Sequence, residues 1–246
     1  MICAIMQPTY FPWIVFFDLI DRVDTFVFLD NVKLEKSDWH VRNRIKGSAG
    51  EILLVVPVRS GEGRMNTLIS TAEVDYRKPW AKKHLRSIEV NYGKTPGYAA
   101  LRELVEPILR EEHSSLARLN MTLIQTLAAK LGITTQFQIA SEMDGVSGVK
   151  DERIVSICQK LGADEYLSPR GSADYLNRES PGGEVVKNGI KLYYQNYEHP
   201  VYDQLFGDFM SHMGCVDLIC NLGFDNALGV IRQGARTHHG HMDVLS

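Results

Sequence analysis

The chain has 246 residues, which is long enough to bury a full hydrophobic core and does not require two domains. Its 44% hydrophobic and 23% charged residues are typical of a globular protein, and its net charge of −3 argues against nucleic-acid binding by bulk charge. No apolar run reaches the roughly 20 residues that span a bilayer, and the N-terminus lacks a signal-peptide pattern. We therefore expect a cytoplasmic protein that does not span the membrane.

The chain opens with the pattern of a strand, a turn, a helix and a second strand. Residues 3–6 form a short apolar run, apolar residues recur at helical spacing over 16–23, and 25–29 form a second run that ends at Asp30. In such a unit the loop after the first strand lies at the carboxyl edge of a parallel sheet, where open α/β proteins bind ligands. Asp30 is expected at the same edge.

The loop between the first strand and the first helix combines rigidity with polar aromatic groups. Pro8 and Pro12 fix the backbone dihedral φ, while Gln7, Tyr10 and Trp13 supply an amide, a phenol and an indole. A rigid aromatic loop of this kind suits a small polar ligand.

The segment 31–46 mixes basic and aromatic residues without a helical pattern and is expected to be a long functional loop or hairpin. Arg42, Arg44 and Lys46 alternate, so on an extended segment they point to one side and present a cationic surface. The same spacing also fits a solvated strand edge, where Lys and Arg discourage aggregation.

Residues 51–58 predict a buried strand closed by Pro57, and 59–64 predict a flexible loop that closes over a site or is a plain surface loop. Helical patterns follow in three successive stretches, 81–90, 99–110 and 116–131. We expect one α/β domain over 1–246 with a mainly helical segment at about 79–131.

Alternation of strands and helices then resumes along the chain. Strand patterns at 136–139, 165–167 and 191–195 and a helix pattern at 150–161 predict a mostly parallel sheet covered on both faces. The fold class is therefore α/β, Rossmann-like or nucleotidylyltransferase-like, with a helical subdomain inserted in the middle of the chain.

The segment 168–176 leaves a predicted strand and leads into a short helical turn. Ser168, Arg170 and Gly171 offer a hydroxyl, a guanidinium and free backbone N–H groups, which suit a phosphate or carboxylate. An ordinary capped turn has the same composition, and no Walker or GxGxxG signature is present.

The chain from Phe206 onward is apolar and helical in pattern. Asp217 and Asn221 lie four residues apart and so share one helix face, where polar side chains need partners. They are either buried hydrogen-bonding residues or part of the floor of a pocket.

Neither the cysteines nor the terminal histidines predict a metal site. The four cysteines are scattered and fit small buried hydrophobes: Cys3, Cys158, Cys215 and Cys220. Histidines at 238, 239 and 241 invite a metal interpretation, but a terminal tract of this kind is expected to be flexible.

Several motifs together resemble the WbqC-like family, and the resemblance covers nearly the whole chain. They are Gln7-Pro-Thr-Tyr-Phe-Pro-Trp13, Phe28-Leu-Asp30, Trp39-His-Val-Arg-Asn-Arg44, Pro57-Val58, Asn91-Tyr92, Tyr166-Leu-Ser-Pro-Arg-Gly171 with Tyr175, Tyr197-Glu-His-Pro-Val-Tyr202 and Asp217-Leu-Ile-Cys-Asn-Leu-Gly223.

The resemblance implies a role in bacterial O-antigen or surface-polysaccharide biosynthesis. The implied reaction transfers an amino acid, such as glycine, or another acyl group to the amino group of a nucleotide-linked deoxyamino sugar. Such an amide needs an activated donor, either an acyl-adenylate made from ATP or a thioester on an acyl carrier protein. The chain layout favours ATP, but Gln7 and Pro8 stand where nucleotidylyltransferase-type enzymes carry a His-x-x-His pair. The alternative is a non-catalytic sugar-nucleotide-binding or scaffold protein of a polysaccharide assembly complex.

Residue roles follow as hypotheses. His199 is the first candidate for a general base because its ordinary pKa lies near neutrality, and Asp30 is the second. A histidine before Pro200 also fits a structural turn. The expected substrate-binding residues are Gln7, Tyr10, Trp13, Trp39, Asn43, Arg44, Asn91, Tyr92, Ser168, Arg170, Gly171, Tyr175, Tyr202, Asp217 and Asn221.

Overall fold

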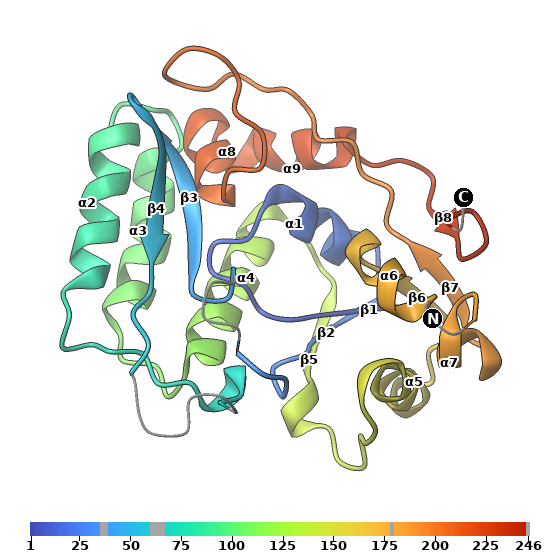
Figure 1. Cartoon of the computed structure of the whole chain (residues 1–246). Helices are drawn as coiled ribbons and strands as arrows, with labels where there is room; N and C mark the ends of the chain where they lie inside the picture. The colour runs from blue at the N-terminus through green and yellow to red at the C-terminus, as the bar shows by residue number, and fades with distance from the viewer. Residues whose placement is uncertain (35–38, 60–66, 178–179, 245–246) are drawn as a thin grey trace.

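The computed structural model describes residues 1–34, 39–59, 67–177 and 180–244, without the side chain of Tyr175 (Figure 1). Within these residues, six strands form one sheet in the order β5-β2-β1-β6-β7-β8. The strands are β1 (Ile2–Met6), β2 (Thr25–Phe28), β5 (Gln136–Ile139), β6 (Glu165–Ser168), β7 (Lys191–Tyr194) and β8 (His239–Gly240). All neighbouring pairs are parallel except β7 and β8. The predicted α/β fold with a mostly parallel sheet is confirmed.

The order of the strands fixes where a ligand site is expected. From β1 the chain builds the sheet in one direction through β2 and β5, and it then returns to the other side of β1 with β6 and β7. This is a Rossmann-like arrangement, and its switch point lies between the carboxyl ends of β1 and β6. The segments that begin at Gln7 and Pro169 leave the sheet at that point.

Helices cover both faces of the sheet (Figure 1). On one face, strand residues such as Cys3, Ile5 and Val27 pack with α5, α6 and α7. On the other, Ala4 and Phe26 pack with α1, α4, α8 and α9. The helices are α1 (Ile14–Asp21), α2 (Trp80–Tyr92), α3 (Tyr98–Arg110), α4 (Leu116–Leu131), α5 (Lys150–Leu161), α6 (Ala173–Leu176), α7 (Gly183–Lys187), α8 (Cys215–Leu222) and α9 (Phe224–Gln233).

The middle of the chain adds a helical layer and a separate hairpin. Helices α2, α3 and α4 follow one another, and the antiparallel pair β3 (Arg42–Gly47) and β4 (Gly50–Val55) lies beside them. The strand expected at 51–58 is present as β4 up to Val55, but the expectation that it is buried is wrong, since Leu53 and Val55 are 48% and 43% exposed. The reason is that β4 has one partner strand and alternates between a packed face and a solvent face.

Two further expectations about the C-terminal part are corrected. The helical pattern does not begin at Phe206: α8 starts only at Cys215, and positive φ angles at Phe206 and His212 interrupt any helix. The expectation that the terminal histidine tract is flexible is wrong. Strand β8 pairs with β7, and His238 Nδ1 lies 2.9 Å from Arg22 Nη1. The loop expected at 59–64 falls largely on residues 60–66, outside the described part of the chain.

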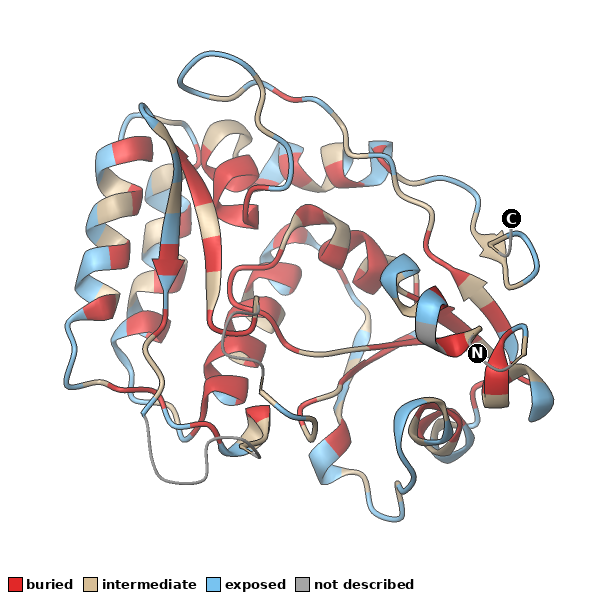
Figure 2. Cartoon of the chain, in the orientation of Figure 1, coloured by how far each residue is buried: buried red, intermediate tan, exposed pale blue. Residues whose placement is uncertain are grey.

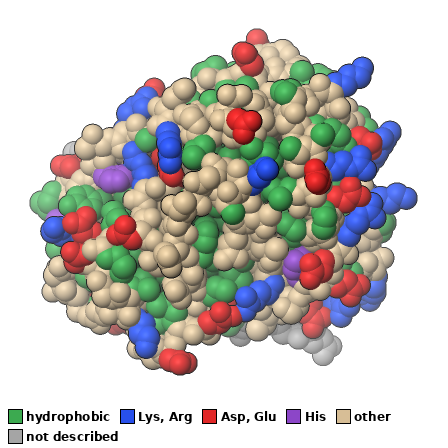
Figure 3. All heavy atoms as spheres, turned by 180° about the vertical axis from the view of Figure 1, so that it is seen from behind, with side chains coloured by type: hydrophobic (Ala, Val, Ile, Leu, Met, Phe, Trp, Pro, Cys, Tyr) green, Lys and Arg blue, Asp and Glu red, His purple; other side chains and the backbone are tan. Residues whose placement is uncertain are grey.

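Burial is concentrated in the sheet and in α4, whereas α2 exposes its outer side (Figure 2). The rear face of the molecule carries Lys and Arg interspersed with Asp and Glu (Figure 3). Among the described residues, no helix combines the length and apolarity needed to cross a membrane. All four cysteines are buried and none is in a disulfide, although the Sγ atoms of Cys3 and Cys158 lie 3.6 Å apart.

Candidate functional site

The loop between β1 and α1, residues 7–13, is fixed by one buried side chain. Asn43 of β3 donates from Nδ2 to the backbone oxygens of Tyr10 and Phe11, at 3.1 and 2.8 Å. Its Oδ1 accepts from the Trp13 indole at 3.2 Å and from the Arg44 backbone N–H at 2.8 Å. A side-chain amide has two donor hydrogens and two acceptor lone pairs, so Asn43 is fully used inside the protein.

Other elements hold the same loop from different sides. Asn120 of α4 donates to the Pro8 oxygen at 3.1 Å, and the Cys215 backbone N–H at the start of α8 donates to Pro12 at 2.9 Å. These bonds stabilise a strained backbone, because Phe11 has a φ of 41°, which bulky side chains rarely adopt. The loop is therefore a rigid part of the core.

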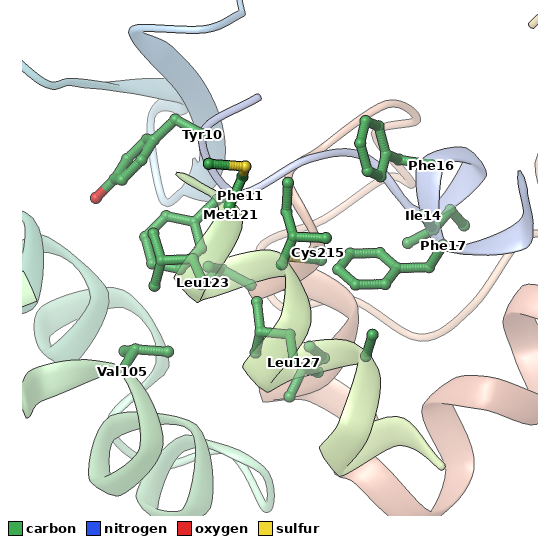
Figure 4. Packing of buried hydrophobic residues seen from close by; sticks show 14 of the residues in the cluster. Tyr10, Phe11, Ile14, Phe16, Phe17, Val105, Met121, Leu123, Leu127 and Cys215 are labelled. Atoms are coloured by element: carbon green, nitrogen blue, oxygen red, sulfur yellow. The ribbon is translucent and has the colours of Figure 1, made fainter. Parts of the chain in front are cut away.

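Tyr10 lies inside the protein rather than on a ligand-facing surface. It is fully buried, and its hydroxyl lies 2.9 Å from Nδ1 of His84 on α2. Figure 4 shows Tyr10 and Phe11 beside Met121 and Leu123 of α4. The phenol that we expected to bind a substrate thus connects the loop to the helical layer.

Trp13 and Trp39 border an apolar hollow at the carboxyl end of β1. Their rings meet edge to face with centroids 5.1 Å apart. The hollow has a volume of about 80 Å³. Its lining combines the end of β1, the loop, α1 and β3: Met6, Thr9, Pro12, Trp13, Val15, Phe16, Trp39 and Asn43. A cavity with aromatic walls at a strand end suits a flat or ring-shaped ligand group.

Two arginines approach the Trp39 ring. The guanidinium carbons of Arg42 and Arg44 lie 5.8 and 5.6 Å from its centroid, within the range of cation–π contacts. Arg44 Nη1 also forms a bidentate ion pair with Glu51, and its Nε donates to the His212 backbone oxygen. Arg44 is thus held in place by three groups of the protein.

Histidines extend this cluster to the loop after β7. The His212 ring lies 5.3 Å from the Trp13 ring, and the His199 ring lies 5.2 Å from that of His212. We call the resulting set the aromatic–basic strip. It consists of Trp13, Trp39, Arg42, Arg44, His199 and His212.

The surroundings of His199 favour the neutral form of its imidazole. Burial lowers its pKa, and the neighbouring His212 acts in the same direction, against a hydrogen bond to Pro200 and the charge of Asp217. The His212 backbone N–H donates to Nε2 at 3.3 Å, so Nδ1 carries the hydrogen and donates to the Pro200 oxygen at 2.9 Å. Both ring nitrogens have partners in the protein.

Asp30 links the carboxyl ends of two neighbouring strands. Its Oδ1 accepts from the Ser141 backbone N–H at 2.9 Å, and its Oδ2 accepts from the Ser141 hydroxyl at 2.6 Å. The carboxylate is buried at 2% exposure, so this bond pair ties the end of β2 to the turn after β5.

The loop after β6 lies on the other side of β1 at the same edge of the sheet. Ser168 is buried and donates to the Pro169 oxygen at 3.3 Å, whereas Arg170 and Gly171 are exposed. Among the described residues, neither Arg170 nor Gln7 has a side-chain partner. Tyr175 belongs to α6, and its side chain lies outside the described part.

A separate polar group is centred on Asp217 of α8, and it contains four of the remaining expected binding residues, Tyr92, Tyr202, Asp217 and Asn221. Asp217 is fully buried and accepts from the hydroxyls of Tyr92 and Tyr202 at 2.6 and 2.8 Å. Asn221 donates to the Asp217 backbone oxygen, and Asn91 donates to the Ser87 backbone oxygen, both at 2.8 Å. These side chains serve as hydrogen-bonding partners within the protein.

Hollows of about 250 and 370 Å³ lie beside β4, and another of about 330 Å³ lies beside β7 and β8. None of the binding residues expected from the sequence lines any of these three. We take the smaller hollow at the end of β1 as the candidate binding site, because it lies beside the switch-point strand and is lined by Trp13, Trp39 and Asn43. Within the described residues, no group of three His, Cys, Asp or Glu side chains could hold a metal ion.

Comparison with known proteins decides the family. The model of the WbqC-like protein family matches residues 7–228. The chain belongs to this family. Uncharacterized protein Rv1507c of Mycobacterium tuberculosis is 35% identical over 221 residues, which cover 89% of this chain and 93% of that protein. No solved structure matches the chain significantly.

The residues that carry the family resemblance have different roles in the structure. Trp13 and Trp39 face the hollow, Asn43 holds the loop, and Asp217 lies in the separate polar group. Sequence reasoning missed Asn120 and His212. Asn120 could have been found as a polar residue within the apolar stripe of its helix, which needs a partner when buried. His212 has no local pattern that marks it.

Asn43→Ala is expected to lower the free energy of unfolding by about 2–4 kcal/mol, since it leaves two loop carbonyls without their donor and removes an acceptor from Trp13. Urea unfolding followed by tryptophan fluorescence measures the change. Asn188→Ala is the matched control, because Asn188 is exposed and its side chain makes only surface bonds, to the Glu184 backbone oxygen at 2.9 Å and to Gln159 Nε2 at 3.5 Å. Equal stability of the two variants would contradict the role given to Asn43.

The Tyr10–His84 pair predicts a pH dependence of stability. Burial lowers the pKa of His84 to about 4 from an ordinary value of 6.5. The unfolded chain therefore binds a proton in this window that the folded chain excludes, so stability present above pH 6.5 is lost as pH falls toward 4.

Urea unfolding at pH 7.5 and pH 5.0 tests this dependence. His84→Gln is expected to reduce the difference in unfolding free energy between the two pH values by about 1–2 kcal/mol. His212→Gln, at an exposed position, serves as the control. An unchanged difference in His84→Gln would show that His84 titrates normally in the folded protein.

Proposed function

We propose that this protein binds a nucleotide-linked deoxyamino sugar at the aromatic–basic strip and joins an amino acid, such as glycine, or another acyl group to the sugar's amino group. Membership of the WbqC-like family supports the substrate class. The proposed setting is the biosynthesis of O-antigen or another surface polysaccharide, in the cytoplasm.

The observation that carries the proposal is the junction of Trp13, Trp39 and two arginines at the carboxyl end of β1. Aromatic rings provide apolar faces for a sugar or a base, and guanidinium groups bind phosphate through charge-assisted hydrogen bonds. Arg42 is the better candidate for a direct phosphate contact, because Arg44 is already paired with Glu51. Arg170, across the switch point, is a further candidate.

The proposed chemistry needs one base and one activated donor. The sugar amine attacks the acyl carbon, a C–N bond forms, and the bond from that carbon to the donor oxygen or sulfur breaks. The leaving group is AMP from an acyl-adenylate or the thiol of a carrier protein. In this proposal His199 Nε2 accepts the proton of the amine, for which it must give up the His212 N–H as its partner.

A second candidate function is non-catalytic binding of a sugar nucleotide within a polysaccharide assembly complex. It is favoured by the bonding of the two candidate bases. Both carboxylate oxygens of Asp30 and both ring nitrogens of His199 already have partners inside the protein. A binding protein would use the aromatic–basic strip without breaking the hydrogen bonds of Asp30 or His199.

A turnover assay with mass spectrometry separates the two functions. The protein is incubated with a uridine-diphosphate-linked amino sugar and glycine plus ATP, or with a glycyl thioester of a carrier protein. An enzyme is expected to yield the amide with either pyrophosphate release or free thiol. In the enzyme case His199→Gln should lower turnover about a hundredfold or more and leave sugar-nucleotide affinity nearly unchanged.

Binding without product in either assay would support the second function. Full activity of His199→Gln across the pH range would exclude His199 as the base. Asp30→Asn, tested beside it, would then decide whether the carboxylate bound to Ser141 takes that role.

A further inference from the structure

The loop that carries His199 and His212 is anchored by two buried charges of opposite sign. This loop, residues 196–213, follows β7 and crosses above α8 and β3 in Figure 1. Lys46 of β3 is 2% exposed and Asp217 of α8 is fully buried. Burial of a charge without compensation is costly, so the partners of these two groups show what holds the loop.

Lys46 binds the loop through backbone oxygens. Its ammonium donates to the oxygens of Asp208 at 2.5 Å and Gly207 at 3.4 Å, and to the Gln204 side-chain oxygen at 3.3 Å. A lysine ammonium has three donor hydrogens and no acceptor, so these three contacts can use all of them.

Gln204 connects the two charges. Its oxygen accepts from Lys46, and its nitrogen donates to Asp217 Oδ2 at 2.7 Å. The same amide also pairs with the backbone of Met210, accepting from its N–H at 2.8 Å and donating to its oxygen at 3.0 Å. The cation on one side and the carboxylate on the other fix the orientation of the amide, which closes the loop between 204 and 210.

We infer that Lys46, Gln204 and Asp217 form a charge–amide–charge clamp whose role is to position His212 against Trp13 and His199 against His212. They are positioning residues: in the described structure they bond to the loop and to one another. Asp217, which the sequence placed among the ligand-binding residues, acts through Tyr202 and Gln204. Only the effect on ligand affinity rests on the proposed function.

A charge-swap pair tests the clamp. Gln204→Glu places a carboxylate against Asp217, and Asp217→Asn removes the charge that accepts three hydrogen bonds. The double variant again holds one carboxylate and one amide, with the carboxylate now beside Lys46. Each single change should therefore loosen the loop, and the double variant should recover part of the loss.

Amide hydrogen exchange measured by NMR reports how readily the loop opens, and it needs no ligand. The reporter is the His212 N–H, which bonds to His199 Nε2. Each single variant should speed its exchange about tenfold or more, and the double variant should reverse at least half of that change on a logarithmic scale. Leu127 of α4 reports on the rest of the fold and should stay protected.

Two further variants complete the test. Asp203→Asn makes the same chemical change on an exposed part of the loop and should leave the exchange unchanged. Tyr202→Phe keeps both charges and removes one donor to Asp217, so it gives a milder result if a charge variant fails to fold. Unchanged His212 exchange in the single variants, or a double variant that shows only the sum of their losses, would overturn the clamp.

The affinity for uridine diphosphate, measured by calorimetry, adds the functional part. Because the loop with His199 and His212 is then less well held, each single variant should bind uridine diphosphate at least fivefold more weakly. If the wild-type protein does not bind uridine diphosphate, this part of the proposed function fails, while the exchange result still decides the clamp.

Discussion

The four hydrogen bonds of Asn43 are the constraint on which the candidate site depends. A loop that holds Phe11 at positive φ would not keep that conformation by its own preferences, even with two prolines beside it. Asn43 supplies donors to two of its carbonyls and an acceptor to the indole of Trp13, all from a position 2% exposed. The hydrogen bonds of Asn43 hold the loop between β1 and α1 in one conformation, and this loop forms part of the wall of the hollow.

That constraint joins three parts of the molecule. Asn43 lies on the β3–β4 hairpin, Asn120 reaches the loop from the helical layer, and Cys215 reaches it from the start of α8. The hairpin also provides Arg42 and Arg44, whose cation–π contacts orient Trp39. The parallel sheet therefore determines where the site lies, and the inserted segments determine which side chains face it.

The sequence predicted the elements well where periodicity was strong. The helices at 116–131 and 150–161 have the expected bounds, because apolar stripes and a terminal glycine mark each of them, and the strand at 136–139 has the expected bounds because Phe137 and Ile139 alternate with glutamines. The prediction of burial failed for β4, because its apolar run does not show that β4 pairs with only one strand. The prediction of a helix failed after Phe206, where the apolar residues belong to a long loop.

The roles of individual site residues were harder to predict, for a physical reason. Asn43, Tyr10 and Asp217 were singled out as polar or aromatic residues in motif positions, but the structure uses their polar atoms for internal hydrogen bonds. The bonds from Asn43 to Phe11, Tyr10 to His84 and Tyr92 to Asp217 span 32, 74 and 125 residues of the chain, so no local pattern can reveal them. Local spacing can mark a residue as constrained, but only the fold shows what constrains it.

The most direct test of the central claim uses the three tryptophans as reporters. Each indole N–H gives its own signal in a two-dimensional ¹H–¹⁵N NMR spectrum, and a uridine-diphosphate-linked amino sugar is titrated into the labelled protein. We predict that the signals of Trp13 and Trp39 move together with one affinity, while that of Trp80, which lines the hollow beside β4, stays in place. Movement of the Trp80 signal alone, or of none of the three, would contradict the placement of the site.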